Sequence, residues 1–539
     1  MKTENVEIET KFVLAGEADL DRVPAALKKI ADRVDFAGTV LLHDTYLDTA
    51  DWALFRSSLA CRIRRQSEVE DRAGRPAKAW LVLKELAAPV GRVSTRLELE
   101  EPLDRVPDRM IRSLPGDTIR RQLRSTLGSR PIRTLFEIEN RRTTYRVKFG
   151  PLEADVAADL VLFRAGPRTA RLVEVELECV RGDATRLTRL ADKLAARLGG
   201  QPAQVSKFQT GLHLAAVEPP RLEGLGDLAL SADQSARAAA QRVIGLLVAQ
   251  AHWHEPGTRL GLLSEPLHQM RVTTRRLRAA LRIFAEAIGG RASSTLRSDL
   301  AELADGLGAV RDLDVYLQDL PAIAQRIGGM DRPAIRLYRQ FLIRRRQRAR
   351  GGLRRMMTSP RYGRLMSRLE QIVRPNEAGA DDDAPGANVP VTQFARQVIR
   401  LYRSQLLRYA RAILAMPSDA QLHRLRLRIK RLRYTCEFLQ SLYSDGYLKL
   451  PRFIRKLIEL QDSLGCFHDA IVQAGMLEAF AAALPDDDPA AESMRHDLGQ
   501  LVAWQRKRQQ RCCRQFFRQW RRYDAKWISR PLKKYIRSA

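Results

Sequence analysis

Two 17-residue segments of this chain align without a gap at a separation of 155 residues. They are HQMRVTTRRLRAALRIF, which begins at His268, and HRLRLRIKRLRYTCEFL, which begins at His423. The shared pattern is HxxRxxx(R/K)RxR. A repeat of this length with unchanged spacing predicts that one structural unit occurs twice in this part of the chain.

Each copy of the repeat predicts an amphipathic helix with a cationic side and an apolar side. Four cationic-side positions per copy fall within an arc of about 80 degrees: His268, Arg271, Arg275 and Arg278, and His423, Arg426, Lys430 and Arg433. Arg276 and Arg431 flank these faces. The opposite faces, which we expect to be buried, carry Met270, Leu277, Leu281 and Phe284, and Leu425, Leu432, Cys436 and Leu439.

The repeat continues downstream of the basic helices. GLGAVRDLDV, which contains Asp312, matches SLGCFHDAIV, which contains Asp469, with the spacing stretched by two residues. A second helix in each copy would therefore bring a carboxylate that orients the basic side chains. A single basic helix face is most simply solvated, but two copies with the same spacing favour a symmetric groove for a polyanion.

Composition supports a polyanionic partner and more than one domain. The chain has 539 residues, more than the roughly 250 to 300 at which single cores stop growing. It has 93 Lys and Arg against 63 Asp and Glu, a formal net charge of +30, which suits nucleic acid, an anionic membrane or inorganic polyphosphate. No apolar run approaches the roughly 20 residues of a membrane span. The six cysteines lack metal-ligand spacings, so we expect reduced thiols in a soluble, cytoplasmic protein.

The chain divides into a strand-rich part and a helical part. We predict a first domain over residues 3–216, a linker with Pro and Gly over 217–230, and an all-α domain over 231–525. An acidic linker over 374–390 separates two helical halves, 231–373 and 391–525. The basic tail with Phe516, Phe517, Trp520 and Trp527 is expected to be a last bundle helix with its aromatic residues in the core.

Several predicted strands of the first domain carry charges of both signs on one face. Glu7, Glu9 and Lys11 alternate with apolar residues, and so do three further sets: Arg62 and Arg64; Arg96, Glu98 and Glu100; and Glu174, Glu176 and Glu178. A sheet with one solvated face is the alternative. A solvated face needs no division into carboxylate and Arg/Lys clusters, however, whereas a site for a metal-bound triphosphate needs both. A closed barrel would bring these faces together in its lumen.

Both parts resemble known families. Residues 231 to 520 resemble the CHAD family, the conserved histidine α-helical domain, which implies two pseudo-symmetric four-helix bundles that bind polyphosphate. Residues 3 to 215 resemble the CYTH family of triphosphate tunnel metalloenzymes, which implies an antiparallel β-barrel with flanking helices. The matches there include ExExK at the start, Tyr46 and Asp48 in TYLDT, Lys84 in LVLKE, RLELE at Arg96, Arg142 with Tyr145, Asp159 and Lys207 in VSKFQTG.

The resemblance implies roles for individual residues. Glu7, Glu9 and Lys11 would be catalytic, and the metal, Mg²⁺ or Mn²⁺, would be held by Glu7, Glu9, Asp159, Glu174 and Glu176. Triphosphate would be bound by Arg62, Arg64, Lys84, Arg96, Arg142 and Lys207. Polyphosphate would be bound by the ten repeat residues His268, Arg271, Arg275, Arg276, Arg278, His423, Arg426, Lys430, Arg431 and Arg433. Asp155 remains an alternative to Asp159, and strand phase does not decide between Arg141 and Arg142.

The expected function is metal-dependent hydrolysis of inorganic triphosphate to phosphate and pyrophosphate, with polyphosphate bound by the helical domain. Such a protein would be cytoplasmic and associated with polyphosphate granules. Two alternatives stay open: an adenylate cyclase-like activity, since the resembled family includes cyclases, and a non-catalytic protein that binds polyphosphate or nucleic acid, with nucleic acid the weaker candidate.

Overall fold

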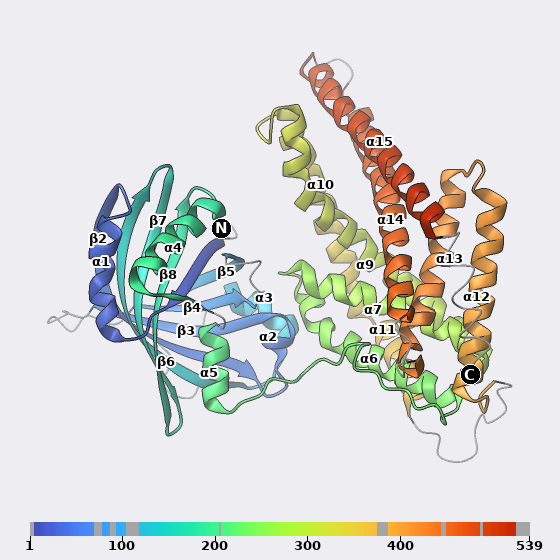
Figure 1. The fold of residues 1–539 in the computed structure, drawn as a ribbon, viewed down its shortest axis with the longest axis horizontal. Helices are drawn as coiled ribbons and strands as arrows, with labels where there is room; N and C mark the ends of the chain where they lie inside the picture. Colours follow the sequence, from blue (N-terminus) through green and yellow to red (C-terminus); the bar gives the residue numbers. More distant parts are fainter. Residues whose placement is uncertain are drawn as a thin grey trace. The chain divides into compact units, whose positions relative to one another are not determined.

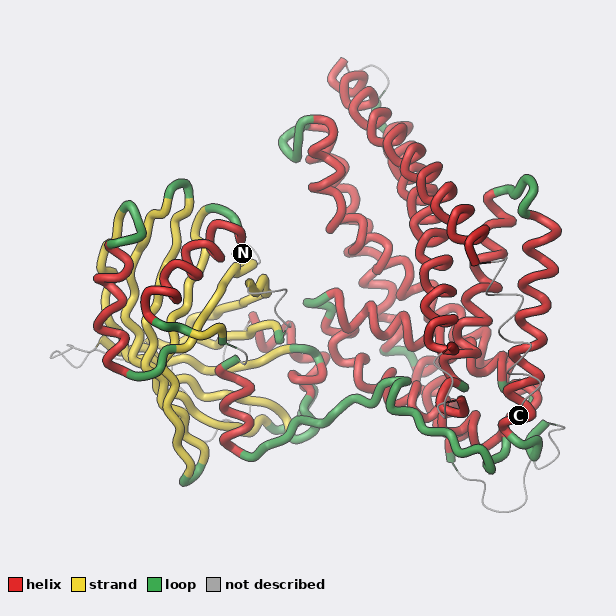
Figure 2. Tube along the Cα trace, viewed as in Figure 1, coloured by secondary structure: helices red, strands yellow, loops and turns green. Residues whose placement is uncertain are grey.

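The structure is a computed structural model that describes residues 5–68, 78–86, 93–103, 118–203, 206–374, 386–443, 449–485 and 489–523. It contains two compact units. One comprises residues 1–221 and 254–266, and the other comprises residues 222–253 and 267–539. Figure 2 shows that the strands belong to the N-terminal part of the chain and that the C-terminal part is helical.

The first unit is a closed antiparallel barrel. Its strands are β1 (Asn5–Val13), β2 (Arg33–Thr49), β3 (Leu59–Glu68), β4 (Lys78–Glu85), β5 (Val93–Leu103), β6 (Ile132–Phe149), β7 (Leu152–Ala165), β8 (Arg168–Arg181) and the short β9 (Gln201–Pro202). They are ordered β5-β4-β3-β2-β6-β7-β8-β1-β9. A further pairing between β1 and β5 joins the two sides of the sheet (Figure 1). The predicted barrel is thus confirmed, and strand alternation directs one face of every strand into its lumen.

Helices accompany the barrel. They are η1 (Glu17–Arg22), α1 (Val23–Lys28), α2 (Ala53–Arg56), α3 (Thr118–Leu127), α4 (Ala184–Leu198) and α5 (Lys207–Ala215). On α4, Leu187, Leu190 and Leu194 are fully buried in a cluster that includes Val175 of β8. The helix α4 therefore covers part of the apolar outer face of the strands, whose charged faces are directed inward.

The second unit is all-helical and duplicated. Its first half contains α6 (Ala236–Leu260), α7 (Ser264–Ile283), α8 (Ala285–Ile288), α9 (Gly290–Ala324), η2 (Gln325–Ile327), α10 (Pro333–Met357) and α11 (Pro360–Val373). Its second half contains α12 (Val391–Ile413), α13 (Asp419–Phe438), η3 (Gln440–Tyr443), α14 (Lys449–Ala482) and α15 (Pro489–Tyr523). Shifted by 155 residues, α7 coincides with α13, and α6, α9 and the pair α10–α11 fall on α12, α14 and α15. The repeat is therefore not limited to the basic motif: the long helices of the first half each have a counterpart in the second half.

The apolar faces predicted for the two repeat helices are buried. Met270, Leu281 and Phe284 of the first copy and their counterparts in the second belong to one core cluster. Phe516 and Trp520 of α15 are buried in the same cluster, as expected for a bundle helix, and Trp527 lies outside the described residues. Among the described helices, none is long and apolar enough to cross a membrane.

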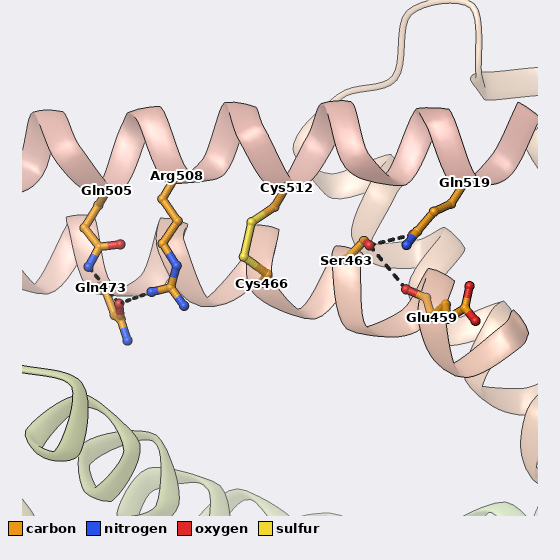
Figure 3. Close-up of a disulfide and its surroundings, with 8 residues drawn as sticks. All are labelled: Glu459, Ser463, Cys466, Gln473, Gln505, Arg508, Cys512 and Gln519. Carbon is orange, nitrogen blue, oxygen red and sulfur yellow. Dashed lines mark hydrogen bonds between the residues drawn. A yellow bond between two sulfur atoms is a disulfide. The ribbon is translucent and has the colours of Figure 1, made fainter. Parts of the chain in front are cut away.

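Cys466 of α14 and Cys512 of α15 form a disulfide, with their Cα atoms 6.0 Å apart (Figure 3). The expectation that all six cysteines are reduced thiols is therefore wrong. The two residues are 46 positions apart, and they meet only because α14 and α15 pack along each other. Spacing motifs do not reveal such a pair, since they record local sequence and not the packing of two helices.

Candidate functional site

The barrel lumen contains a cavity of about 460 Å³. It is lined mainly by charged residues from the strands: Glu7, Glu9, Lys11, Arg62, Arg64, Lys84, Glu85, Arg96, Glu98, Glu100, Arg142, Glu176 and Glu178, with Lys207 from α5. The charged strand faces identified in the sequence therefore converge on one space. A solvated outer face, the alternative explanation, does not apply to these residues.

A first group of carboxylates lies on β1 and β8. Oxygens of Glu7, Glu9 and Glu176 lie within 4.8 Å of one another. Lys84 Nζ lies 2.5 Å from Glu7 Oε2 and 3.1 Å from Glu9 Oε2, and it is 3.2 Å from Glu98. Burial and the neighbouring Glu98 and Glu9 outweigh Lys84 and raise the pKa of Glu7 to about 9. Glu7 is therefore mostly protonated near neutral pH in the absence of a bound cation, and a cation bound beside it would favour its charged form.

A second group shares Glu176 with the first. Oxygens of Asp159, Glu174 and Glu176 also lie within 4.8 Å of one another, and Asp159 and Glu174 are fully buried. Arg142 donates two hydrogen bonds to Asp159, at 2.8 and 2.7 Å. Lys207 Nζ lies 2.8 Å from Asp159 and 2.5 Å from Glu174. Two buried carboxylates are thus compensated by one guanidinium and one ammonium.

The capping of α5 places Lys207 in this cluster. Ser206 accepts a hydrogen bond from the backbone N–H of Gln209, whose side chain accepts one from the N–H of Ser206. Phe208 packs against Tyr46 and Phe136, with ring centroids 5.6 and 5.9 Å apart. The first turn of α5 is therefore held at the barrel interior, so Lys207 points among the carboxylates.

The structure separates the alternatives that the sequence left open at two positions. Arg142 lines the cavity, whereas Arg141 pairs with Glu17 at the surface, 2.9 Å away. Asp159 belongs to a carboxylate group, and among the described residues Asp155 belongs to neither group. All other residues expected at the triphosphate site line the cavity or, in the case of Glu174, lie directly behind it.

Sequence reasoning missed Asp44. Arg64 donates hydrogen bonds from Nε and Nη2 to the two Asp44 oxygens, at 2.8 and 2.9 Å, and Arg62 Nη1 lies 3.3 Å from Asp44 Oδ2. Burial favours protonation, but Arg62 and Arg64 outweigh it and hold the pKa of Asp44 below its usual range. The available signal was that Asp44 alternates with Tyr46 and Asp48 on β2.

In the helical unit, the two basic helices line a single cavity of about 540 Å³. Its cationic lining consists of Arg271, Arg275, Arg278 and Arg282 from α7 and His423, Arg426, Lys430 and Arg431 from α13, with His468 from α14. Asp312 of α9 and Asp469 of α14, predicted from the repeat, also line it. The two cationic faces therefore form one site rather than two separate surfaces.

Glycines in the matched downstream segments lie beside two of these arginines. A Cβ atom on Gly308 would lie 2.3 Å from Arg271 Nη1, and one on Gly465 would lie 3.5 Å from Arg426 Nη2. Arg271 reaches Asp312 at 3.3 Å. Gly308 thus lets Arg271 lie against the neighbouring helix, where Asp312 orients it, whereas a Cβ atom at Gly465 would make an ordinary contact with Arg426.

The cations of this cavity repel one another. Burial, together with Arg275, Arg426 and Arg271, lowers the pKa of Lys430 to about 6. Burial and the adjacent charges of His468, Arg426 and Lys430 also lower the pKa of His423. The rings of His423 and His468 lie 4.9 Å apart. In the free protein Lys430 therefore loses its proton near neutral pH. A bound polyanion would raise the pKa of Lys430 again and favour its charged form.

Three of the ten predicted polyphosphate residues do not line this cavity: His268, Arg276 and Arg433. Two of them are directed toward Glu437 instead: Arg276 lies 3.6 Å and Arg433 lies 3.4 Å from its carboxylate. Arg282, which the motif omitted, lines the cavity. It continues the spacing of Arg271, Arg275 and Arg278 by one further turn, which is the signal that would have identified it.

Family models match both parts of the chain. The model of the CYTH domain matches residues 5–209, and the model of the CHAD domain matches residues 242–478. An uncharacterised protein of Mycobacterium tuberculosis, Rv2226, is 28% identical over 470 residues, which cover 82% of this chain and 84% of the relative.

Solved structures resemble each part separately. The CHAD domain of the plant Ricinus communis is 29% identical, with a TM-score of 0.44, and the match covers 54% of this chain and 92% of that one. A Hippeastrum protein described as having a dominant triphosphatase activity is 22% identical, with a TM-score of 0.29, and the match covers 38% of this chain and 95% of that one. From the two family matches, this chain carries a CYTH domain at residues 5–209 followed by a CHAD domain at residues 242–478.

Proposed function

We propose that the CYTH domain hydrolyses inorganic triphosphate to phosphate and pyrophosphate with Mg²⁺ or Mn²⁺, and that the CHAD domain binds polyphosphate. One observation supports the first part above all others. Carboxylates suited to a divalent cation and Arg/Lys side chains suited to phosphate face each other across one barrel cavity.

The carboxylate groups fit a metal ion. Glu9 Oε1 and Glu174 Oε2 are buried and accept no hydrogen bond from the described residues, and each belongs to one of the groups of three converging carboxylates. Arg96 Nη1 lies 3.7 Å from Glu9 Oε1, beyond hydrogen-bond distance, and a bound divalent cation would satisfy such buried oxygens. We assign Glu7, Glu9, Asp159, Glu174 and Glu176 to metal binding. A bound Mg²⁺ or Mn²⁺ would neutralise phosphate charge and make a bound water more acidic.

The cations of the cavity would hold the substrate. Lys11, Arg62, Arg64, Lys84, Arg96, Arg142 and Lys207 surround the space with donors for the phosphate oxygens. Lys84, Arg142 and Lys207 now neutralise carboxylates, so metal binding there would release these side chains for phosphate. Lys84, Arg142 and Lys207, which lie at the carboxylate groups, would also stabilise the charge that develops in the transition state. Glu7, Glu9 and Lys11, from one strand, would place the attacking water and the phosphate together.

The CHAD cavity supports the second part of the proposal. Eight Arg, Lys and His residues from two symmetry-related helices line it together with His468. Forked guanidinium groups match phosphate oxygens, and two equivalent helices suit a ligand made of repeated identical anionic units.

Phosphate release tests the enzymatic proposal. Purified protein would be incubated with triphosphate, ATP, thiamine triphosphate and long-chain polyphosphate, each with Mg²⁺, Mn²⁺ or chelator. We expect rapid turnover of triphosphate that requires metal. Failure to hydrolyse any of these substrates would show that the barrel is a binding domain.

Two other functions give different results in simple assays. A cyclase would form cyclic AMP from ATP and Mn²⁺, and we expect none. A nucleic-acid-binding protein would retain RNA or DNA when challenged with long-chain polyphosphate at matched phosphate concentration, and we expect displacement. Both polyanions bind in a salt-dependent manner, so competition discriminates where salt dependence does not.

A further inference from the structure

Asp44 of β2 lies behind the triphosphate cavity and contacts two of its arginines. Its side chain is buried, with 3% of the residue exposed, and Asp44 does not line the cavity. Arg64 forms a forked pair with it through Nε and Nη2, and Arg62 approaches the same carboxylate. Both arginines lie on β3 and line the cavity. Among the described residues, the ion pairs and hydrogen bonds of Asp44 with cavity-lining side chains are those with Arg62 and Arg64.

Asp44 is distinct from the carboxylates assigned to metal. Among the described residues, the two converging groups are formed by Glu7, Glu9, Asp159, Glu174 and Glu176. Both oxygens of Asp44 are already engaged by guanidinium groups at hydrogen-bond distance. Asp159 also forms a forked pair, with Arg142, but it converges with Glu174 and Glu176, whereas among the described residues Asp44 belongs to no group of converging carboxylates.

The forked pair fixes the plane of the Arg64 guanidinium. Nε and one N–H of Nη2 are used by Asp44, which directs the Nη1 side of the guanidinium toward a ligand in the cavity. Arg62 is held from three directions, by Asp44, by the Tyr46 hydroxyl at 3.1 Å and by Glu98 at 3.3 Å. A long arginine side chain that is fixed before the ligand arrives loses less conformational entropy on binding.

We infer that Asp44 is a positioning residue that holds Arg62 and Arg64 in the orientation in which they bind the phosphate groups of triphosphate. This inference rests on the proposed triphosphatase function. An interaction that holds substrate equally in the ground state and the transition state affects KM and leaves kcat nearly unchanged. Loss of the Asp44 charge is therefore expected to raise KM for triphosphate, because Asp44 then no longer holds Arg62 and Arg64 in place.

The chain provides a matched control on the same strand. Asp48 is also buried, with 1% of the residue exposed, and its carboxylate accepts hydrogen bonds from the backbone N–H groups of Thr49, Leu54 and Phe55 at 2.7, 3.0 and 3.0 Å. It caps the turn that contains α2 and does not line the cavity. Asp48→Asn removes a buried charge from β2 without touching either arginine.

The test compares KM, kcat, the melting temperature and the Mg²⁺ concentration for half-maximal rate in wild type, Asp44→Asn and Asp48→Asn. We expect Asp44→Asn to raise KM for triphosphate about tenfold, since charged hydrogen bonds are lost, with kcat within about threefold and an unchanged Mg²⁺ requirement. Asp48→Asn should lower the melting temperature and leave KM unchanged. If Asp44→Asn fails to fold, Asp44→Glu, which keeps the charge but displaces it, should raise KM in the same way.

The outcomes separate this inference from the proposed function. A wild-type protein without turnover would overturn both. An active wild type with an unchanged KM in the folded Asp44 variant, or with a shifted Mg²⁺ requirement, would overturn the positioning role of Asp44 alone.

Discussion

Lys207 Nζ lies 2.8 Å from the Asp159 carboxylate, although the two residues belong to different elements 48 positions apart. The same ammonium group lies 2.5 Å from Glu174. Lys207 comes from the first turn of α5, and the carboxylates come from β7 and β8. The helix α5 thus supplies a positive charge that compensates two fully buried acids, of which Asp159 is also paired with Arg142.

Lys207→Ala is predicted to affect both stability and activity. It leaves buried carboxylates under-compensated, which typically costs about 3 kcal/mol, and it removes a phosphate ligand, for which we expect about a hundredfold loss of triphosphate turnover. Since a divalent cation can replace the lost charge, Mn²⁺ should raise the melting temperature of the variant more than that of wild type.

The control for this change is Lys193→Ala. Lys193 is exposed on α4, where its ammonium lies over the Phe149 ring at 5.1 Å. Calorimetry and phosphate-release assays should find it close to wild type. Normal turnover in Lys207→Ala would contradict the placement of this lysine in the active site.

Gly308→Ala is predicted to weaken polyphosphate binding without unfolding the helical domain. The new methyl group would lie 2.3 Å from Arg271 Nη1, the end of a flexible side chain that moves aside and so leaves its place in the cavity. We expect about a tenfold loss of affinity, equivalent to about 1.4 kcal/mol. Gly465→Ala, with a 3.5 Å contact, should have a smaller effect.

Gly499→Ala is the matched control, because Gly499 is exposed on α15 and a Cβ atom there meets nothing within 4 Å. Titration with long-chain polyphosphate would compare the three variants with wild type. Equal affinity for Gly308→Ala and Gly499→Ala would refute the role of Arg271.

The lowered pKa of Lys430 predicts that the protein takes up a proton when it binds polyphosphate. In the free protein its pKa is lowered to about 6, so at pH 8 the side chain is mostly neutral, and a polyanion favours its charged form. Affinity should therefore fall as pH rises above about 6. Calorimetry at pH 8 in buffers with different ionisation enthalpies measures the uptake directly.

The arginine of the Lys430→Arg variant is charged at every accessible pH. This variant should therefore take up fewer protons than wild type when it binds polyphosphate. The same shift affects folding: between about pH 6 and 10.5 the unfolded chain holds the Lys430 proton and the folded protein does not, so the contribution of Lys430 to stability rises with pH across this window. Identical proton uptake by wild type and Lys430→Arg would contradict the account.

The disulfide predicts four titratable thiols in the denatured, unreduced protein, because Cys466 and Cys512 are linked and four of the six cysteines are free. Reduction, or Cys512→Ser, should destabilise the helical domain by about 2 to 4 kcal/mol, since the link closes a long loop in the unfolded chain. Denaturant unfolding with and without reductant measures the difference. Six reactive thiols would show that the link does not form.

The sequence predicted the periodic features of this protein and missed its long-range pairs. Two-residue alternation placed Glu7, Glu9 and Lys11 on one lumen face, and the repeat placed Arg271 and Arg426 in one cavity. Alternation shows that Arg141 and Arg142 point to opposite faces of β6, but it does not show which of these faces is directed into the lumen. The arginines that contact Asp44 lie on the neighbouring strand β3, and Arg276, which contacts Glu437, lies on another helix, so only the packing of these elements reveals the pairs.

The most direct test of the central claim is phosphate release from triphosphate by wild type and Glu9→Ala, each with saturating Mg²⁺ or Mn²⁺ and with chelator. Glu9 belongs to the first carboxylate group and has a buried oxygen that accepts no hydrogen bond from the described residues. We predict turnover in wild type that chelator abolishes and that Glu9→Ala lacks. Full activity of Glu9→Ala under saturating metal would contradict the assignment of the barrel cavity as a metal-dependent triphosphatase site.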